Sequence, residues 1–478
     1  MRVRFAPSPT GYLHIGNART AVVNYITAKK HNAQFILRVE DTDLERSTKE
    51  SEISIMDDLK WLGINWTEGP GLGGDYGPYR QSERFEIYKK FTQKLLSEGK
   101  AYYCYCTKEE LEEDRKDADG NVKSFEYSGK CRALTEEDKK KFEAQGIKPT
   151  VRFHVLNNKT INFNDTLKGE VNFNSNNIGG DFIIVRSDEI PVYNYIVVID
   201  DCLMNITHVI RGEDHLSNTP KQILLAEALE FSIPKYAHLP LILGNDRAKL
   251  SKRHGITSVN LYRSEGYLPQ TLFNYLGMLG WASESENEIK TFEELLNEFD
   301  MNNLGKSAAI FDFQKLRWMN NSYINQLSKE KAFELFTPYL TSANYQIDTL
   351  PKDKIESICE LLKANCETLS DIVKFIGIFL DETVTPDEEA VEMLKEEYSK
   401  PILEAVKEIL NEGLNETNYL NIIELIKNKS GNTGKKLFMP LRALITGRLK
   451  GPDLHLSLPL IGVDKLNQRL TYCVKKFL

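Results

Sequence analysis

The stretch that decides the fold is MRVRFAPSPTGYLHIGNARTAVVNYITAKK, residues 1–30. Residues 2–6 predict a short strand, and Pro7, Pro9 and Gly11 then interrupt regular structure. From Leu13 onward, apolar residues recur at helical spacing. These residues are Ile15, Ala18, Val22, Val23 and Ile26. The order of strand, turn and helix is typical of the opening of a nucleotide-binding α/β fold.

The start of this helix is a candidate phosphate-binding site. A helix start offers free N–H groups and the positive end of its dipole, which suit phosphate. Gly16 has no side chain, so a base or ribose can approach the backbone closely. His14 and Asn17 fall on one helical face and can both donate hydrogen bonds. The alternative is an ordinary crossover unit with a surface histidine.

A second candidate segment is KLSKR, residues 249–253. It contains two lysines, Lys249 and Lys252, with Ser251 between them, and residues 244–246 (GND) precede it. Together these residues predict a mobile basic loop. Taken alone, the segment is also compatible with an ordinary solvated run of charge.

Length and composition predict a multidomain soluble protein. The chain of 478 residues is too long for one core, and it is 41% hydrophobic and 27% charged. No apolar run reaches transmembrane length, no secretory segment is evident, and seven cysteines without an export signal indicate a reducing cytoplasm. The net charge of −8 is not typical of a nucleic-acid-binding protein, although a local basic face is enough to contact phosphates.

Together the two candidate segments resemble the signature pair of class I aminoacyl-tRNA synthetases. Here the pair stands as HIGN, residues 14–17, and KLSKR, with Asn17 in place of a histidine and Leu250 in place of a methionine. Further motifs are similar to those of bacterial glutamyl-tRNA synthetases. They are APSPTG (6–11), LRVEDTD (37–43), THVIRGEDH (207–215) and KLFMPLRALITG (436–447). The resemblance extends over nearly the whole chain.

Charged residues at two strand ends are candidates for binding an amino acid. Residues 35–40 predict a strand that ends in the carboxylate of Glu40, at the edge of an α/β sheet where ligands bind. Asp43 follows and is either part of this carboxylate cluster or a helix cap. The resemblance implies that Glu40 holds the α-amino group of the substrate and that Tyr193 lines the amino-acid pocket.

Arg211 follows the apolar pair Val209-Ile210, so we expect it to point from a buried strand into a cleft. A buried arginine needs an anion, and its fork of donors fits a carboxylate. An internal ion pair with Glu213 or Asp214 is the alternative. The resemblance implies that Arg211 and Arg4 hold the side-chain carboxylate of glutamate. The glutamate-binding set is Arg4, Ala6, Ser8, Glu40, Tyr193 and Arg211.

Three cysteines form a candidate metal site, because thiolates suit zinc. The spacing Cys104-Tyr-Cys106 is tighter than the common pair, and Cys131 follows further on. A lone pair at this spacing is also compatible with a structural role. The resemblance implies a structural Zn²⁺ on three cysteines and a fourth ligand, for which Tyr127 is the candidate, since Ala133 stands where some relatives have a histidine.

We expect an α/β fold with four parts. These are a Rossmann-type catalytic domain (1–103 and 181–235), an acceptor-end-binding α+β insertion (104–180), a stem-contact domain with the KLSKR loop (236–320), and an all-helical anticodon-binding region (321–478). Residues 181–201 predict a pair of apolar strands around Pro191. At their end, Asp200 and Asp201 suggest metal binding or strand-end capping.

The resemblance implies that the protein activates L-glutamate with ATP and Mg²⁺ and transfers it to tRNA(Glu), or to tRNA(Gln) as well. The implied catalytic residues are His14, Asn17, Lys249 and Lys252, and the ATP-binding residues add Gly16 and Ser251. A paralogue that glutamylates a modified tRNA base and a catalytically silent tRNA-binding protein are the rival hypotheses. We expect a cytoplasmic monomer without membrane contact.

Overall fold

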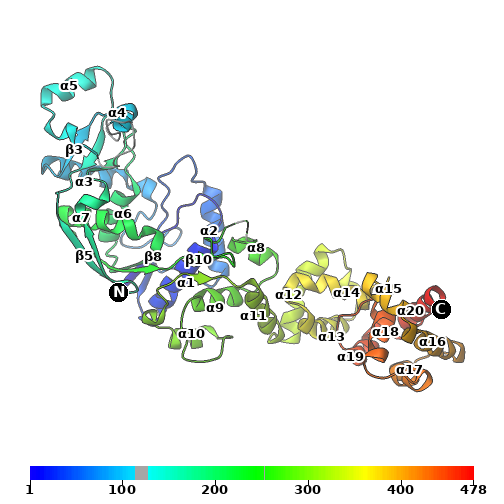
Figure 1. Cartoon of the computed structure of the whole chain (residues 1–478). Helices are drawn as coiled ribbons and strands as arrows, with labels where there is room; N and C mark the ends of the chain where they lie inside the picture. Colours follow the sequence, from blue (N-terminus) through cyan, green and yellow to red (C-terminus); the bar gives the residue numbers. More distant parts are fainter. Residues whose placement is uncertain (114–126, 252, 254) are drawn as a thin grey trace. The chain divides into compact units, whose positions relative to one another are not determined.

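The structure is a computed structural model that describes residues 1–113, 127–251, 253 and 255–478. The chain forms two compact units (Figure 1). The first consists of Met1–Tyr262 and Leu272–Asp312, and the second of Arg263–Thr271 and Phe313–Leu478. Within the described ranges, no helix combines the length and the apolar character that crossing a membrane requires.

The first unit opens as the sequence predicts, with β1 (Arg2–Phe5), α1 (Ile15–Lys30) and β2 (Gln34–Leu37). The two strands are parallel, and Arg4 lies opposite Ile36. Most of α1 is buried, and its last turn carries Lys29 and Lys30, which complement the negative end of the helix dipole. The strand–turn–helix prediction is confirmed.

A four-stranded sheet continues the first unit. Its order is β6 (Gly169–Asn174), β5 (Thr160–Asp165), β9 (Lys235–Leu239) and β8 (His208–Gly212). β8 and β9 are parallel, and β5 joins β9 through the pair Asp165 and Tyr236. β1 runs beside β8, where the N–H of Thr207 donates to the carbonyl of Arg2 over 3.0 Å. The carboxyl ends of β1, β8 and β9 carry the candidate site.

The remaining elements of the first unit surround these strands. Three antiparallel strands form another sheet, in the order β3 (Ala101–Cys104), β4 (Thr150–Phe153) and β7 (Phe182–Val185). The first helices are α2 (Lys49–Trp61), α3 (Phe85–Ser97), α4 (Lys108–Glu113), α5 (Glu136–Ala144) and α7 (Thr219–Leu229). The later elements are β10 (Ile242–Leu243), α8 (Val259–Ser264), α9 (Pro269–Met278), α10 (Phe292–Glu298) and β11 (Ala309–Ile310). Of these, α8 and α9 each continue into residues of the second unit.

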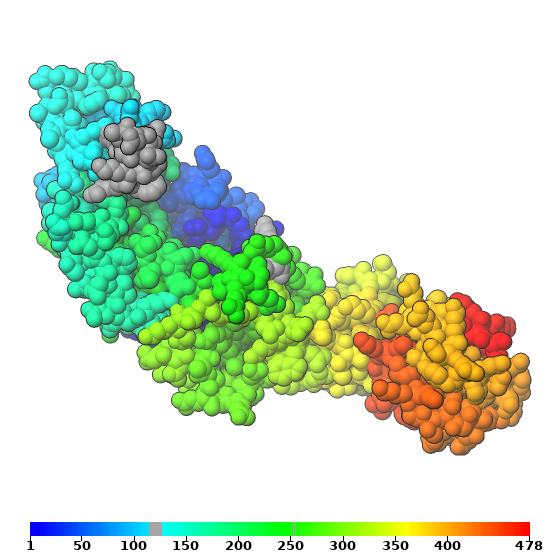
Figure 2. Space-filling model, in the orientation of Figure 1, coloured from blue at the N-terminus to red at the C-terminus, as the bar shows by residue number. Residues whose placement is uncertain are grey.

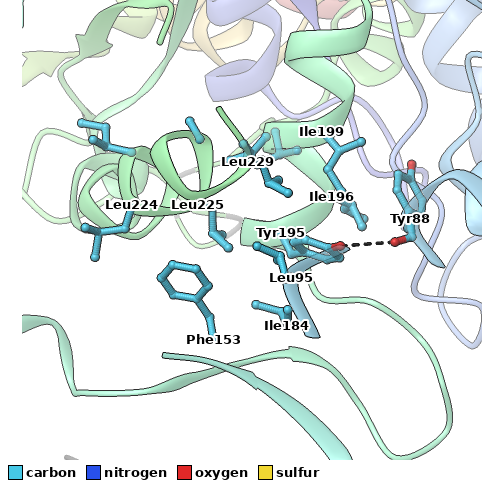
Figure 3. Close-up of a cluster of buried hydrophobic side chains, with 14 of the residues drawn as sticks. Tyr88, Leu95, Phe153, Ile184, Tyr195, Ile196, Ile199, Leu224, Leu225 and Leu229 are labelled. Atoms are coloured by element: carbon cyan, nitrogen blue, oxygen red, sulfur yellow. Dashed lines mark hydrogen bonds between the residues drawn. The ribbon is translucent and has the colours of Figure 1, made fainter. Parts of the chain in front are cut away.

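The prediction of two strands around Pro191 is wrong in its second half. β7 ends at Val185, and the apolar run after Pro191 forms α6 (Tyr193–Leu203). Figure 3 shows residues of α6 and α7 in one buried cluster, where the hydroxyl of Tyr195 donates to the carbonyl of Tyr88 over 3.2 Å. An apolar run without polar alternation does not distinguish a buried strand from a buried helix.

Asp200 and Asp201 lie on α6 and are buried, so neither caps a strand. The carboxylate of Asp200 accepts hydrogen bonds from Arg84 (2.7 Å), Gln81 (2.8 Å) and Tyr88 (2.9 Å). These contacts neutralise its charge inside the core, so the expected capping role is replaced by a buried ion-pair network.

The second unit is helical throughout its described residues, which confirms the predicted helix-rich tail. The atoms of residues 313–478 are coloured from yellow-green to red in Figure 2. The helices are α11 (Phe313–Asn325), α12 (Lys329–Ser342), α13 (Lys352–Leu362), α14 (Ile372–Leu380), α15 (Glu388–Lys395), α16 (Lys400–Glu412), α17 (Ile422–Ser430), α18 (Lys435–Thr446), α19 (Leu454–Ile461) and α20 (Val463–Phe477).

The buried carboxylate of Asp200 predicts a large stability effect. Asp200→Ala removes the countercharge of Arg84 in the core, and the free energy of unfolding of the first unit should fall by about 3–5 kcal/mol. Urea denaturation followed by circular dichroism measures this loss. The control Asp188→Ala removes a carboxylate that is 47% exposed and pairs with Arg186, and it should change stability by less than about 0.5 kcal/mol. Equal effects of the two variants would contradict the prediction.

Candidate active site

A cavity of about 730 Å³ opens at the carboxyl ends of β1, β8 and β9. Ligands of open α/β sheets bind at this edge. The structure brings ten predicted residues together around the cavity. They are Arg4, Ala6, Ser8, His14, Gly16, Asn17, Glu40, Tyr193, Arg211 and Lys249. Ser251 is not among the lining residues, and Lys252 lies outside the described residues.

His14 caps the helix that forms one wall of the cavity. It is the N-cap residue of α1, and its Nδ1 accepts a hydrogen bond from the N–H of Gly16 over 3.1 Å. Burial and the nearby Lys249 hold the pKa of His14 below its usual value, which favours the neutral ring. Because Nδ1 is the acceptor in the neutral ring, Nε2 carries the proton. His14 therefore offers the ligand a hydrogen-bond donor.

The start of α1 has fewer free N–H groups than the sequence suggests. The N–H of Ile15 donates to the carbonyl of Thr257 over 2.9 Å, and that of Gly16 is taken by His14. A Cβ added at Gly16 would meet only Nδ1 of His14, at 3.6 Å. The protein therefore leaves open space beside Gly16, and Gly16 lines the cavity.

Opposite charges face the cavity from the first two strands. Arg4 on β1 donates to the buried carboxylate of Asp201 from Nε over 3.2 Å. Glu40, which follows β2, accepts from Nη2 of Arg38 over 3.0 Å. Burial raises the pKa of Glu40 despite the opposing effect of Arg38. A ligand ammonium group at this carboxylate would favour its ionised form.

Arg211 on β8 is a buried cation without a carboxylate partner among the described residues. It donates from Nε to Nε2 of His238 over 3.1 Å and from Nη2 to the hydroxyl of Thr219 over 2.9 Å. Its Nη1 has no partner in the described part of the chain. The expected alternative, an ion pair with Glu213 or Asp214, is not formed. Arg211 can therefore receive an anionic ligand.

Those two acidic residues have other partners. Glu213 pairs with Lys168, and Asp214 lies 3.5 Å from Nζ of Lys249. Two further lining residues contact each other, since the hydroxyl of Tyr193 lies 3.2 Å from Nδ1 of His215. The two carboxylates are therefore engaged by lysines and not by Arg211.

Sequence reasoning missed Arg38, His238 and Thr219, which hold the charged residues of the cavity. Arg38 stands inside the apolar run of residues 35–40 and is fully buried. His238 likewise stands inside an apolar segment and is fully buried. A polar residue within an otherwise apolar strand is the signal that identifies such groups, because a buried polar side chain needs a partner.

The predicted metal ligands form a compact cluster of their own. The sulfurs of Cys104, Cys106 and Cys131 lie within 4.8 Å of one another. The hydroxyl of Tyr127 lies 3.5 Å from Sγ of Cys104 and 3.3 Å from Sγ of Cys106. Tetrahedral zinc–thiolate geometry separates its sulfurs by roughly 3.8 Å. The cluster can therefore hold a metal ion with these side chains nearly in place.

Comparison with protein families assigns both units. Residues 1–318 match the model described as tRNA synthetases class I (E and Q), catalytic domain. Residues 331–474 match the model described as anticodon binding domain. The two matched ranges together cover most of the chain.

Individual relatives match over their full length. The "Glutamate--tRNA ligase" of Carboxydothermus hydrogenoformans is 48% identical, over 98% of this chain and 99% of the relative. The protein of the same name from Bacillus subtilis (strain 168) is 46% identical, over 98% of this chain and 99% of the relative. A solved glutamate tRNA ligase from Elizabethkingia meningosepticum, in complex with its amino acid, has a TM-score of 0.86 at 34% identity and covers 100% of both chains.

The geometry of His14 predicts that its two ring nitrogens have separable roles. His14→Asn should keep the N-cap bond, whereas His14→Ala should lose it and reduce the free energy of unfolding by about 1 kcal/mol. Both variants lose the Nε2 donor, so both should weaken ATP binding by about tenfold. Urea denaturation and isothermal titration calorimetry measure the two effects. Unchanged ATP binding by both variants would contradict the donor role.

Proposed function

The chain belongs to the glutamate–tRNA ligase family of class I aminoacyl-tRNA synthetases, and we propose that it activates L-glutamate with ATP and transfers it to tRNA(Glu). The observation that carries this proposal is Arg211, a buried cation that lines the cavity without a carboxylate partner among the described residues. It supplies the charge that the side chain of glutamate requires.

Glutamate binds between charges of opposite sign. Its side-chain carboxylate lies against Arg211 and Arg4, and its α-ammonium group lies against Glu40. Ala6, Ser8 and Tyr193 line the same cavity and complete the amino-acid pocket. Glutamine would leave the charge of Arg211 without an anion in a buried site, which is costly. This pocket therefore selects an acidic side chain.

ATP binds beside the amino acid, at the start of α1. His14 donates to a phosphate oxygen, Gly16 lets the nucleotide approach the backbone, and Asn17 contributes a second polar side chain. Lys249, Ser251 and Lys252 complete the set, and the two lysines offset the charge of the phosphates. Mg²⁺, when bound to the nucleotide oxygens, supplies further neutralisation of this charge.

Activation needs no general base. The α-carboxylate of glutamate is already a nucleophile, and it attacks the α-phosphorus in line while pyrophosphate leaves. The protein accelerates this step by holding the two reactants in the reacting geometry and by stabilising the developing charge on the phosphates. The catalytic residues in this sense are His14, Asn17, Lys249 and Lys252.

In the second step the 2′-hydroxyl of the terminal adenosine of tRNA attacks the activated carbonyl, and AMP leaves. We assign acceptor-end binding to residues 104–180, stem contact to residues 236–320 and anticodon binding to residues 321–478. The anticodon-domain match of residues 331–474 supports tRNA as substrate over a modified base. Charging of tRNA(Gln) as well is the alternative substrate range.

A structural Zn²⁺ is held by Cys104, Cys106, Cys131 and Tyr127. Three soft thiolates and one phenol oxygen supply four ligands, which is the number that structural zinc sites use. Cys104 ends β3 and Cys106 follows it, whereas Cys131 lies in the short helical turn Lys130–Ala133 and Tyr127 precedes that turn. When bound, the ion ties this loop to the strand and takes no part in the reaction.

The protein acts in the cytoplasm as a monomer. All seven cysteines are unpaired, which is consistent with a reducing compartment. A monomer is what the resemblance to bacterial glutamyl-tRNA synthetases implies.

The proposed pocket predicts a large effect of Arg211 on glutamate binding. Arg211→Leu leaves the substrate carboxylate without its principal cation, which costs about 3 kcal/mol. The KM for glutamate should therefore rise by about 100-fold or more. Aminoacylation of a tRNA(Glu) transcript with labelled glutamate measures this change.

Arg186→Leu is the matched control, because Arg186 is 55% exposed and pairs with Asp188. It should leave the KM unchanged. A parallel assay with a tRNA(Gln) transcript decides between the two substrate ranges. If the native chain charges neither transcript, or if Arg211→Leu behaves like the control, the assignment of the pocket is wrong.

The cysteine cluster predicts a bound metal that depends on its thiols. The purified chain should contain about one zinc per molecule, and Cys106→Ser should lose most of it because a weaker ligand replaces a thiolate. Cys202→Ser, outside the cluster, should keep the metal. Inductively coupled plasma mass spectrometry measures the content. A native chain that is free of zinc and binds none on titration refutes the site.

A further inference from the structure

A buried polar network lies behind the cavity and ends on Arg211. Nδ1 of His238 lies 2.6 Å from Oδ2 of Asp165, and both side chains are fully buried. On the other edge of the ring, Arg211 donates from Nε to Nε2 of His238 over 3.1 Å. The order of carboxylate, imidazole and guanidinium therefore runs from β5 through β9 to β8.

This arrangement fixes the tautomer of His238. The guanidinium of Arg211 is always charged and can only donate, so Nε2 of His238 must accept. The proton then resides on Nδ1, which donates it to Asp165. A doubly protonated ring would oppose two donors across 3.1 Å. Burial also lowers the pKa of His238, which favours the same neutral form.

Thr219 accepts a second hydrogen bond from the guanidinium of Arg211. It is fully buried at the start of α7, and its hydroxyl accepts from Nη2 of Arg211 over 2.9 Å. With Nε and Nη2 engaged, the plane of the guanidinium is fixed. Nη1, which has no partner among the described residues, is left in a fixed direction.

The two arginines of the pocket are held differently. Arg4 contacts the carboxylate of Asp201 directly. Arg211 contacts two neutral acceptors, and the carboxylate of Asp165 is one imidazole ring away. A carboxylate in direct contact would compete with an anionic substrate for Arg211. Neutral acceptors orient the guanidinium and leave its charge available.

We propose that His238, held by Asp165, is the positioning residue that fixes Arg211 for the side-chain carboxylate of glutamate and thereby sets the selectivity for glutamate over glutamine. This inference rests on the proposed role of Arg211. It adds two residues, outside the cavity lining, that act through Arg211 and not on the substrate.

Asp165 also connects the pocket to the β5–β6 hairpin. Its Oδ1 accepts from the N–H groups of Leu167 and Lys168, both over 2.9 Å. Removing the carboxylate would therefore disturb the turn as well as the histidine. Asparagine at this position keeps an oxygen for the turn and changes the partner of His238 from an acceptor to a donor.

The test compares two substitutions of His238, each of which retains a polar atom near only one of the two ring nitrogens. His238→Asn places an amide near the position of Nδ1 and leaves Nε of Arg211 without an acceptor, so the KM for glutamate should rise by about tenfold. His238→Gln places an amide oxygen near Nε2 and should keep the KM within about threefold of the native value. In both variants kcat should change less than the KM.

Asp165→Asn provides a second, nearly isosteric route to the same effect. The new amide donates to Nδ1 of His238, which forces the ring proton to Nε2 and turns a donor toward Arg211. The KM for glutamate should rise by about tenfold or more. The preference for glutamate over glutamine, measured as the ratio of kcat/KM in tRNA-dependent ATP–pyrophosphate exchange, should fall in Asp165→Asn and in His238→Asn.

His208→Gln is the matched control, because His208 lies on the same strand as Arg211 but contacts Thr207 and does not line the cavity. It should leave KM and selectivity unchanged. Equal effects of His238→Asn and His238→Gln, or native values in His238→Asn and Asp165→Asn, overturn the inference. A native KM in Arg211→Leu would instead refute the pocket itself, so the two failures are distinguishable.

Discussion

The first unit depends on a guanidinium that is fully removed from solvent. Arg38 contacts Asp201 at 2.7 Å and Glu40 at 3.0 Å, and it lies 3.9 Å from Asp200. An unpaired buried charge costs several kcal/mol, so the acidic turn of α6 must lie opposite the end of β2. Asp201 in turn holds Arg4 on β1. One buried cation therefore places both Glu40 and Arg4, the acidic and the basic end of the proposed amino-acid pocket.

Much of the fold and the site follows from the sequence, because the residues concerned lie in ordered motifs. The strand–turn–helix of residues 1–30 is marked by prolines, a glycine and a clear helical period. His14, Glu40 and Arg211 come from three distant segments, yet all line one cavity. They are recognisable because each stands at the end of an apolar strand or at a helix start, where α/β sheets bind their ligands.

The residues that escaped prediction are those whose role exists only in three dimensions. The apolar run of α6 is predicted as a strand because, without polar alternation, its sequence does not distinguish a buried strand from a buried helix. The same error places Asp200 and Asp201 at a strand end. His238 is one histidine in an apolar segment, and nothing local indicates that Asp165, 73 positions earlier, would face it. Periodicity reports which face of an element is buried, but not which partner from another element will meet it there.

The capping bond of His14 limits how a synthetic inhibitor can contact this side chain. Because Nδ1 is engaged by the first turn of α1, an inhibitor can address this imidazole through Nε2 alone. A compound designed to bind both ring nitrogens would have to unwind the start of a helix that is otherwise buried. The same bond restricts resistance through substitution at position 14, since a residue that cannot accept from the N–H of Gly16 also loosens the helix that lines the cavity.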